Sequence, residues 1–100
     1  MVLKKIQLKF LGSLRHDLNR PSLLWPIETN TSVRLIVAEL TQDPQYEELR
    51  SFFSETLEVK RSLLVFLNDQ EISALSGMDT LVQQDDTLAF IPVIHGGTSS

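Results

Sequence analysis

The residues with the clearest chemical potential lie near the end of the chain, where Gly96 and Gly97 form a diglycine. The chain has only four glycines, and two of them stand here side by side. Glycine leaves the carbonyl carbon unhindered and permits nearly any backbone angle. A terminus of this kind can enter a narrow channel and present an acyl group to another protein's nucleotide or metal centre. We therefore expect a chain that carries its end to enzymes and performs no catalysis of its own.

The remaining reactive side chains form weaker candidates. The absence of cysteine excludes a disulfide scaffold, a thiol nucleophile and a thiolate zinc site. His16 and His95 are distant in the sequence, and two such histidines without cysteine do not predict a metal site. His95, beside the diglycine, is a candidate contact for a partner, or simply an exposed histidine. Asp85 and Asp86 precede a strand, where paired acids are typical of a turn. We expect neither a catalytic residue nor a bound cofactor.

Composition sets the class of protein. With 100 residues, 42% hydrophobic and 22% charged, the chain matches one globular domain with a single core. The net charge of −4 and the scattering of its nine Lys and Arg residues argue against nucleic acid as the main partner. No apolar run approaches the roughly 18 residues that a membrane helix needs. The start lacks a secretory pattern, so we expect a cytoplasmic monomer that binds neither nucleic acid nor membranes.

The first third of the chain predicts a hairpin. Ile6, Leu8 and Phe10 alternate with polar residues at the period of a half-buried strand. Residues 11–22 are predicted to form a long loop, and residues 23–27 a second strand. Because Pro26 cannot donate to a sheet ladder, this second strand is expected at a sheet edge, or to end at the proline.

The middle of the chain predicts helices. Val33, Ile36, Val37 and Leu40 fall on one helical face, behind the capping residues 29–32. A cap residue and proline at 43–44 restart the pattern as a short second helix or helical turn. Its apolar residues are expected in the core: Tyr46, Leu49 and Phe53.

Two further strands complete the predicted fold, at 63–67 and 87–91, with a turn at 68–70 and a short return that begins at Ile72. The order of elements is that of the α+β β-grasp architecture. In it a mixed sheet of four or five strands wraps around one main helix, and the first and last strands run parallel in the centre.

The third and last strands are apolar in both phases, yet one helix covers one sheet face only. If Val65, Leu67, Leu88 and Phe90 point inward, the other phase points to solvent: Leu64, Phe66, Ala89 and Ile91. An exposed apolar patch marks an interaction surface. Either this patch docks a partner, or the second helix folds over it.

The last third of the chain carries a family resemblance. Residues 65–68, Leu81, the acidic turn 84–86, the strand after it and the ending Pro92, Val93, Ile94, His95, Gly96, Gly97 resemble the ubiquitin-like sulfur carriers. These comprise the thiamine and molybdopterin sulfur carriers and the ubiquitin-related modifiers. The length and the Ile-His-Gly-Gly ending are most similar to the ubiquitin-related modifiers. The resemblance implies one ubiquitin-like β-grasp domain over residues 1–97.

The resemblance also implies a chemistry at Gly97. In such families an activating enzyme uses ATP to adenylate the final glycine, and a sulfur source then converts it to a thiocarboxylate. The sulfur passes to an acceptor enzyme, as in tRNA thiolation or cofactor synthesis, or the acyl group passes to lysines of target proteins. Gly96 would give the tail freedom, and Pro92, Val93 and Ile94 would stiffen it. The docking residues implied are Leu64, Phe66, Ala89, Ile91, Pro92, Val93, Ile94 and His95.

The chain departs from the family after the diglycine, since Thr98, Ser99 and Ser100 follow Gly97. As written, Gly97 has no free carboxylate. One explanation is a precursor that a deubiquitinase-like metallopeptidase cuts between Gly97 and Thr98. The others are an appended tail foreign to the protein, or a ubiquitin-like domain that binds partners without covalent chemistry. A small sulfur-carrier subunit of molybdopterin synthase is a further alternative.

Overall fold

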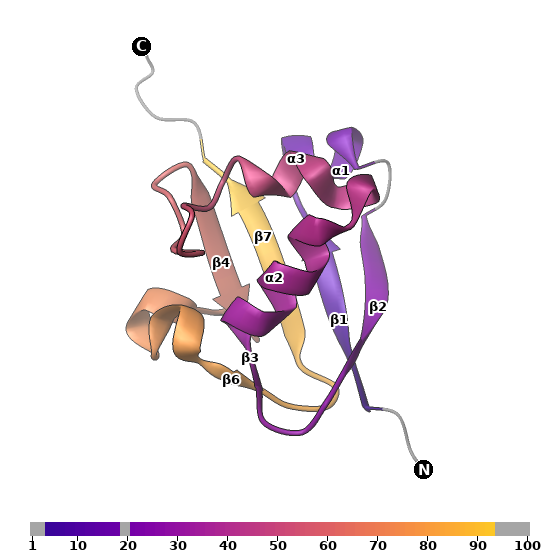
Figure 1. Cartoon of the computed structure of the whole chain (residues 1–100), viewed down its shortest axis with the longest axis vertical. Helices are drawn as coiled ribbons and strands as arrows, with labels where there is room; N and C mark the ends of the chain where they lie inside the picture. The colour runs from indigo at the N-terminus through magenta and orange to yellow at the C-terminus, as the bar shows by residue number, and fades with distance from the viewer. Residues whose placement is uncertain (1–3, 19–20, 94–100) are drawn as a thin grey trace.

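The computed structural model describes residues 4–18 and 21–93 and arranges them as a sheet with helices on one face (Figure 1). The main sheet has the strand order β2-β1-β7-β4-β5, and β3 pairs with β6 in a second, two-stranded sheet. The strands are β1 (Lys4–Phe10), β2 (Ser22–Ile27), β3 (Thr31–Ser32), β4 (Leu63–Leu67), β5 (Gln70–Glu71), β6 (Leu81–Val82) and β7 (Thr87–Pro92). The helices are α1 (Ser13–Asp17), α2 (Val33–Gln42) and α3 (Glu47–Arg50), with 3-10 turns η1 (Pro44–Tyr46), η2 (Ile72–Ala74) and η3 (Gly77–Asp79).

The first and last strands lie side by side, as the sequence predicts. β1 runs parallel to β7, with Leu8 opposite Leu88 and Phe10 opposite Phe90. The other neighbouring strands of the main sheet are antiparallel, which makes the sheet mixed. This topology confirms the predicted β-grasp architecture.

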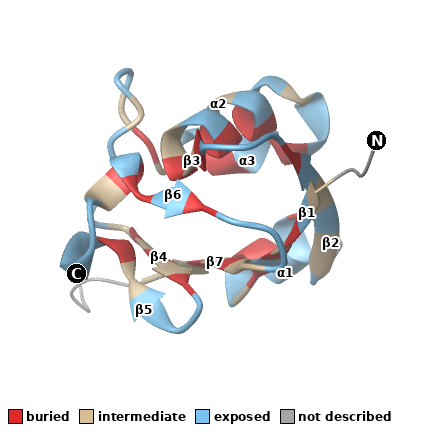
Figure 2. Cartoon of the chain, turned by 90° about the horizontal axis from the view of Figure 1, so that it is seen from below, coloured by how far each residue is buried: buried red, intermediate tan, exposed pale blue. Residues whose placement is uncertain are grey.

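The core lies between the sheet and α2, where Figure 2 shows the buried residues gathered between the two layers. Ile6, Leu8 and Phe10 are all buried, so the alternation of β1 is confirmed. The ring of Phe10 stacks on those of Tyr46 and Phe90, with centroids 6.0 Å and 5.8 Å away. Offset aromatic stacks of this kind stabilise a core beyond the apolar area they bury.

Both predicted helix starts are confirmed. The Leu35 amide donates to the Ser32 hydroxyl at 3.2 Å, which caps the first turn of α2. The predicted stripe of this helix is buried: Val33, Ile36, Val37 and Leu40. The Gln45 amide donates to the Asp43 carboxylate at 2.9 Å, and Pro44 opens η1. Tyr46, Leu49 and Phe53 are buried in the core, as predicted.

Two local predictions are wrong. The segment 11–22 is not only a loop, because it contains α1, whose Leu14 is completely buried. Five residues are too few to show a helical period, and the helix is held by this burial. The short return after β4 does not begin at Ile72, since β5 is Gln70–Glu71 and Ile72 starts η2.

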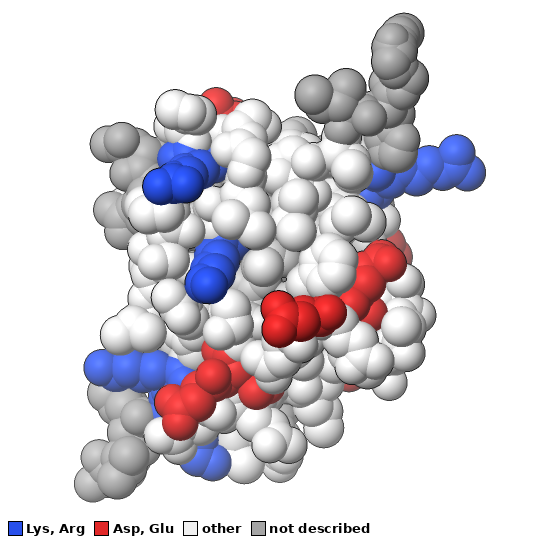
Figure 3. Space-filling model, turned by 180° about the vertical axis from the view of Figure 1, so that it is seen from behind, with Lys and Arg blue, Asp and Glu red and all other residues white. Residues whose placement is uncertain are grey.

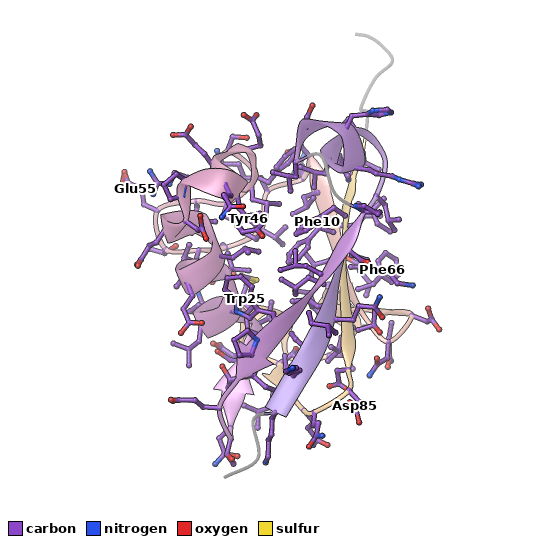
Figure 4. The ribbon with its side chains drawn as sticks, turned by 90° about the vertical axis from the view of Figure 1, so that its right-hand side faces the viewer. Phe10, Trp25, Tyr46, Glu55, Phe66 and Asp85 are labelled. Carbon is purple, nitrogen blue, oxygen red and sulfur yellow. The ribbon has the colours of Figure 1, made fainter. Side chains whose placement is uncertain are left out.

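The outer face of the sheet is not covered by the second helix. α3 buries Leu49 in the same core as α2, and Figures 1 and 4 show α2 and α3 on one side of the sheet. Figure 4 shows Phe66 on the opposite side, pointing away from Phe10 and Tyr46. The alternative in which this helix folds over the second apolar phase is therefore wrong.

The edge strand β2 is also as predicted, although it continues through Pro26 to Ile27. The Phe10 amide donates to the Pro21 carbonyl, so odd-numbered residues of β2 turn their backbone toward β1. Pro26 therefore stands where its missing N–H would face solvent, a position that blunts an exposed sheet edge. None of the helices among the described residues is long and apolar enough to span a membrane.

Candidate functional site: the open sheet face and the end of β7

The outer face of the sheet is built from the second phase of β4 and β7. Ala89 lies opposite Phe66, and Ile91 lies opposite Leu64, across the antiparallel β4–β7 pair. All four side chains are half-buried, whereas their neighbours in the other phase are buried in the core. The structure therefore brings these predicted docking residues together on one face.

A shallow depression of about 330 Å³ lies on this face. Its lining combines three of the predicted residues with four others: Phe66, Ala89, Ile91, and Lys9, Leu11, Asp69, Thr87. Figure 3 views this side and shows mainly uncharged atoms over its middle, with charged side chains of both signs around them. Such a surface suits an apolar partner patch with charged groups at its rim.

Sequence reasoning missed Lys9 and Asp69 as members of this face. Lys9 belongs to the polar phase of β1, which the parallel pairing places beside Ala89. Asp69 sits in the turn after β4 with a positive φ of 73°. The signal was available for Lys9, because a parallel first and last strand puts the polar phase of one beside the apolar phase of the other.

Three charged residues beside the apolar centre of this face are separated by sign. Lys9 is exposed on β1, while Asp69 is exposed and Glu71 half-exposed on the β4–β5 side. The ion pairs seen among residues 4–18 and 21–93 join Arg34 to Glu58 and Asp79 and involve none of these three side chains. The charges therefore remain available to a partner.

The end of β7 is held firmly by its neighbours. Pro92 pairs with Leu63, and the Val93 amide donates to the Ser62 carbonyl at 2.9 Å. Pro92 and Val93 are thus held against the start of β4 at the C-terminal end of the central strand β7. The other predicted residues, Ile94, His95, Gly96, Gly97 and Thr98, lie outside the described residues.

The acidic pair before β7 forms a turn, as predicted. Asp86 accepts hydrogen bonds from the Asn68 side chain at 2.8 Å and from the Gln83 amide at 2.9 Å. Asn68 in turn accepts one from the Thr87 amide at 2.9 Å. Within the described ranges, no three His, Asp or Glu residues gather as metal ligands. This network ties the end of β4 to the start of β7, at the end of the sheet away from Val93.

Comparison with known protein families identifies the family of this chain. The model of the family Urm1 (Ubiquitin related modifier) matches residues 5–97. The chain belongs to the ubiquitin-related modifier family. The matched stretch of this modifier contains all of the sheet except Lys4 and ends at Gly97, so Thr98, Ser99 and Ser100 lie beyond it.

Individual relatives agree with this membership. Small archaeal modifier protein 3 of Haloferax volcanii is 26% identical over 93% of this modifier and 99% of its own length. The solution structure of the Haloferax volcanii HVO 2177 protein superposes with a TM-score of 0.80 at 25% identity, over 95% of this chain and 88% of that one. The solution structure of small archaeal modifier protein 1 from Methanosarcina acetivorans superposes with a TM-score of 0.77 at 25% identity. The match covers 97% of this chain and 100% of that one. The family is one of ubiquitin-like modifiers and sulfur carriers.

Proposed function

We propose that this modifier acts through the carboxylate of Gly97, once a metallopeptidase has removed Thr98, Ser99 and Ser100. The observation that carries the proposal is the family match, which ends at Gly97 although three residues follow. Hydrolysis of the bond between Gly97 and Thr98 adds one water and leaves a glycine carboxylate without a side chain. Such an end offers little steric hindrance to an adenylating enzyme.

The proposed chemistry has three steps, none of which this chain catalyses. The Gly97 carboxylate attacks the α-phosphorus of ATP in the activating enzyme and releases pyrophosphate, which gives an acyl adenylate. A sulfur source then displaces AMP and leaves a thiocarboxylate on Gly97. This group either gives its sulfur to an acceptor enzyme or reacts, after renewed activation, with a lysine amine of a target protein to form an isopeptide bond.

The open sheet face is proposed to dock the activating enzyme. Its half-buried apolar residues lie on β7, which leads into the tail, and on β4, which begins beside the end of β7, so docking there fixes the point from which the tail starts. From Val93 onward, four residues to Gly97 can span at most about 14 Å. The proposed site for adenylation therefore lies within that distance of the sheet end.

Intact-mass measurement tests the proposal. The full chain is incubated with the metallopeptidase, the activating enzyme, ATP and a sulfur source from its own cells. We expect a loss equal to Thr-Ser-Ser, followed by a gain that matches the replacement of one oxygen by sulfur. An unchanged mass with active enzymes would instead favour a ubiquitin-like domain that binds only non-covalently.

Two variants separate docking from folding. Phe66→Asp is expected to slow thiocarboxylate formation, whereas Leu35→Asp, which introduces the same charge at an exposed leucine on α2, is expected to leave it unchanged. Equal effects of the two substitutions would contradict docking through the sheet face.

A further inference from the structure

The charge arrangement of the open sheet face is self-complementary. From β1 to β5 one register row contains Lys9, Ala89, Phe66 and Glu71 in that order. Neighbouring strands lie about 4.8 Å apart, so Lys9 and Glu71 are separated by roughly 14 Å. A line drawn between β7 and β4 divides the row into two equal halves. Lys9 and the small Ala89 lie on one side of it, and the large Phe66 and Glu71 lie on the other.

We propose that a second copy of this chain docks on this face, related by a two-fold axis that runs along the strands between β7 and β4. Such an axis places the outer faces of the two sheets against each other and reverses the order of the strands in the second copy. Lys9 of one copy then faces Glu71 of the other, and the reciprocal pair forms on the opposite side. An isologous contact of this kind satisfies both copies with one surface patch.

The apolar centre fits the same symmetry. The axis places Phe66 of one copy over Ala89 of the other, so a large side chain meets a small one. In the next row it places Leu64 over Ile91, two side chains of similar volume. Two sheets packed face to face lie about 10 Å apart and within about 30° of each other, which suits this alternation of sizes.

The charged rim supports a second copy over an arbitrary apolar partner. Lys9, Asp69 and Glu71 make no ion pair within the described ranges, and Asp69 lies in the same depression as Phe66 and Ala89. Within this row the positive Lys9 lies on one side of the axis and the negative Glu71 on the other, which is the pattern that a copy of itself complements. Charge complementarity of this kind chiefly sets register and specificity.

The size of the face predicts a weak dimer. β1 and β7 turn three residues each to this face, β4 two and β5 one. At about 4.8 Å between strands and about 6.7 Å between outward residues, these nine cover roughly 300 Å² per copy, or about 600 Å² in total. Stable specific interfaces bury about 1,200–2,000 Å², so the dimer is expected to be transient, with a dissociation constant between roughly 10 μM and 1 mM. The chain is then a monomer when dilute and associates when concentrated.

The dimer has a regulatory consequence that rests on the proposed function. It buries the residues that would dock the activating enzyme, so association and activation exclude each other. A high local concentration of the modifier would therefore lower the fraction open to adenylation.

A charge-swap series tests the dimer without any enzyme. Sedimentation equilibrium of the full chain, up to about 1 mM, is expected to show a mass that rises from 11.3 kDa toward twice that value. Lys9→Glu alone, and Asp69→Lys with Glu71→Lys, are each expected to remain monomeric because like charges then face each other. An equimolar mixture of these two proteins is expected to associate again as a heterodimer. Lys60→Glu makes the same change in net charge as Lys9→Glu, at an exposed loop position, and is expected to behave as the original chain.

The outcomes are decisive. Full recovery of association in the mixture, with amide shifts at Phe66, Ala89 and Ile91 on concentration, supports the proposal. A chain that stays at 11.3 kDa throughout, or that associates equally after Lys9→Glu, overturns it. A monomer that binds only the activating enzyme overturns the dimer and leaves the mass assay for Gly97 unaffected, so the two failures can be told apart.

Discussion

Phe66 on β4 and Phe90 on β7 stand on neighbouring strands and point to opposite faces of the sheet. Phe90 is completely buried, with its ring 5.8 Å from that of Phe10. Phe66 is half-buried and lines the depression on the outer face. A phenylalanine thus packs in the core from β7, while another forms part of the outer surface on the neighbouring β4.

This difference predicts unequal costs of truncation. Phe90→Ala should lower the free energy of unfolding by about 3–5 kcal/mol, because it leaves a cavity in a close-packed core. Phe66→Ala should lower it by less than about 1.5 kcal/mol, since its side chain already contacts water. Urea denaturation of both variants measures the difference. Similar losses would show that the outer face is part of the folding core.

The start of α2 predicts a second stability effect. Ser32→Ala removes the hydroxyl that accepts from the Leu35 amide and should cost about 1 kcal/mol of unfolding free energy. Ser73→Ala, at an exposed serine of η2, should stay within about 0.5 kcal/mol of the original chain. Urea denaturation measures both variants, and equal denaturation midpoints would mean that the cap does not stabilise the helix.

Much of the fold could be predicted because its determinants are local. The two-residue period of β1 and the stripe beginning at Val33 need only neighbouring residues to be read, and both are confirmed. The two apolar phases of β4 and β7 likewise predict an apolar outer face, because a single helix covers only one side of a sheet. The pairing of Phe66 with Ala89 then groups these residues on that face.

The rest depended on contacts between distant parts of the chain. α1 is too short for a period, and it exists because Leu14 is buried in the core. Lys9 and Glu71 become members of one row only when β1, β7, β4 and β5 are placed in order. Asp69 lies in the predicted turn 68–70, but its place in the depression follows only once that turn is set beside β7.

The approach of α1 to the end of β7 predicts a third effect. Gly12 has φ +59°, and a Cβ added there would meet the Pro92 ring at 3.6 Å, an ordinary contact distance. The cost of Gly12→Ala is therefore backbone strain rather than a clash, and we expect about 1–3 kcal/mol in unfolding free energy. Ser13→Ala, next in the chain, is the control for the loss of a surface residue. A Gly12→Ala midpoint equal to that of the control would contradict strain at this position.

Arg34 joins three separate segments on the far side of α2. Its Nη2 donates to the Glu58 carboxylate at 2.7 Å, its Nε donates to Asp79 at 3.3 Å, and its Nη1 donates to the Thr56 carbonyl. The hydrogen bond to Glu58 is the main reason that its pKa is raised above the usual value. Leu57 lies within the loop that this side chain holds and has a positive φ of 62°. The guanidinium thus secures a strained loop against α2.

Arg34→Lys should loosen this loop, because an ammonium group cannot reach the same three partners in a planar fork. Hydrogen exchange should quicken at the Leu57 and Glu58 amides, which now donate to Ser54, while the β1 amides stay protected. Because the pKa of Arg34 is raised in the folded state, its contribution to stability is fully present at any pH below the usual pKa of arginine. It is lost only as the pH rises through the higher folded value. The difference in exchange rate at these amides between the original chain and the variant should therefore persist from neutral to moderately alkaline pH. It should shrink in high salt. Exchange that is equally fast in both proteins would show that the loop is held by its own hydrogen bonds alone.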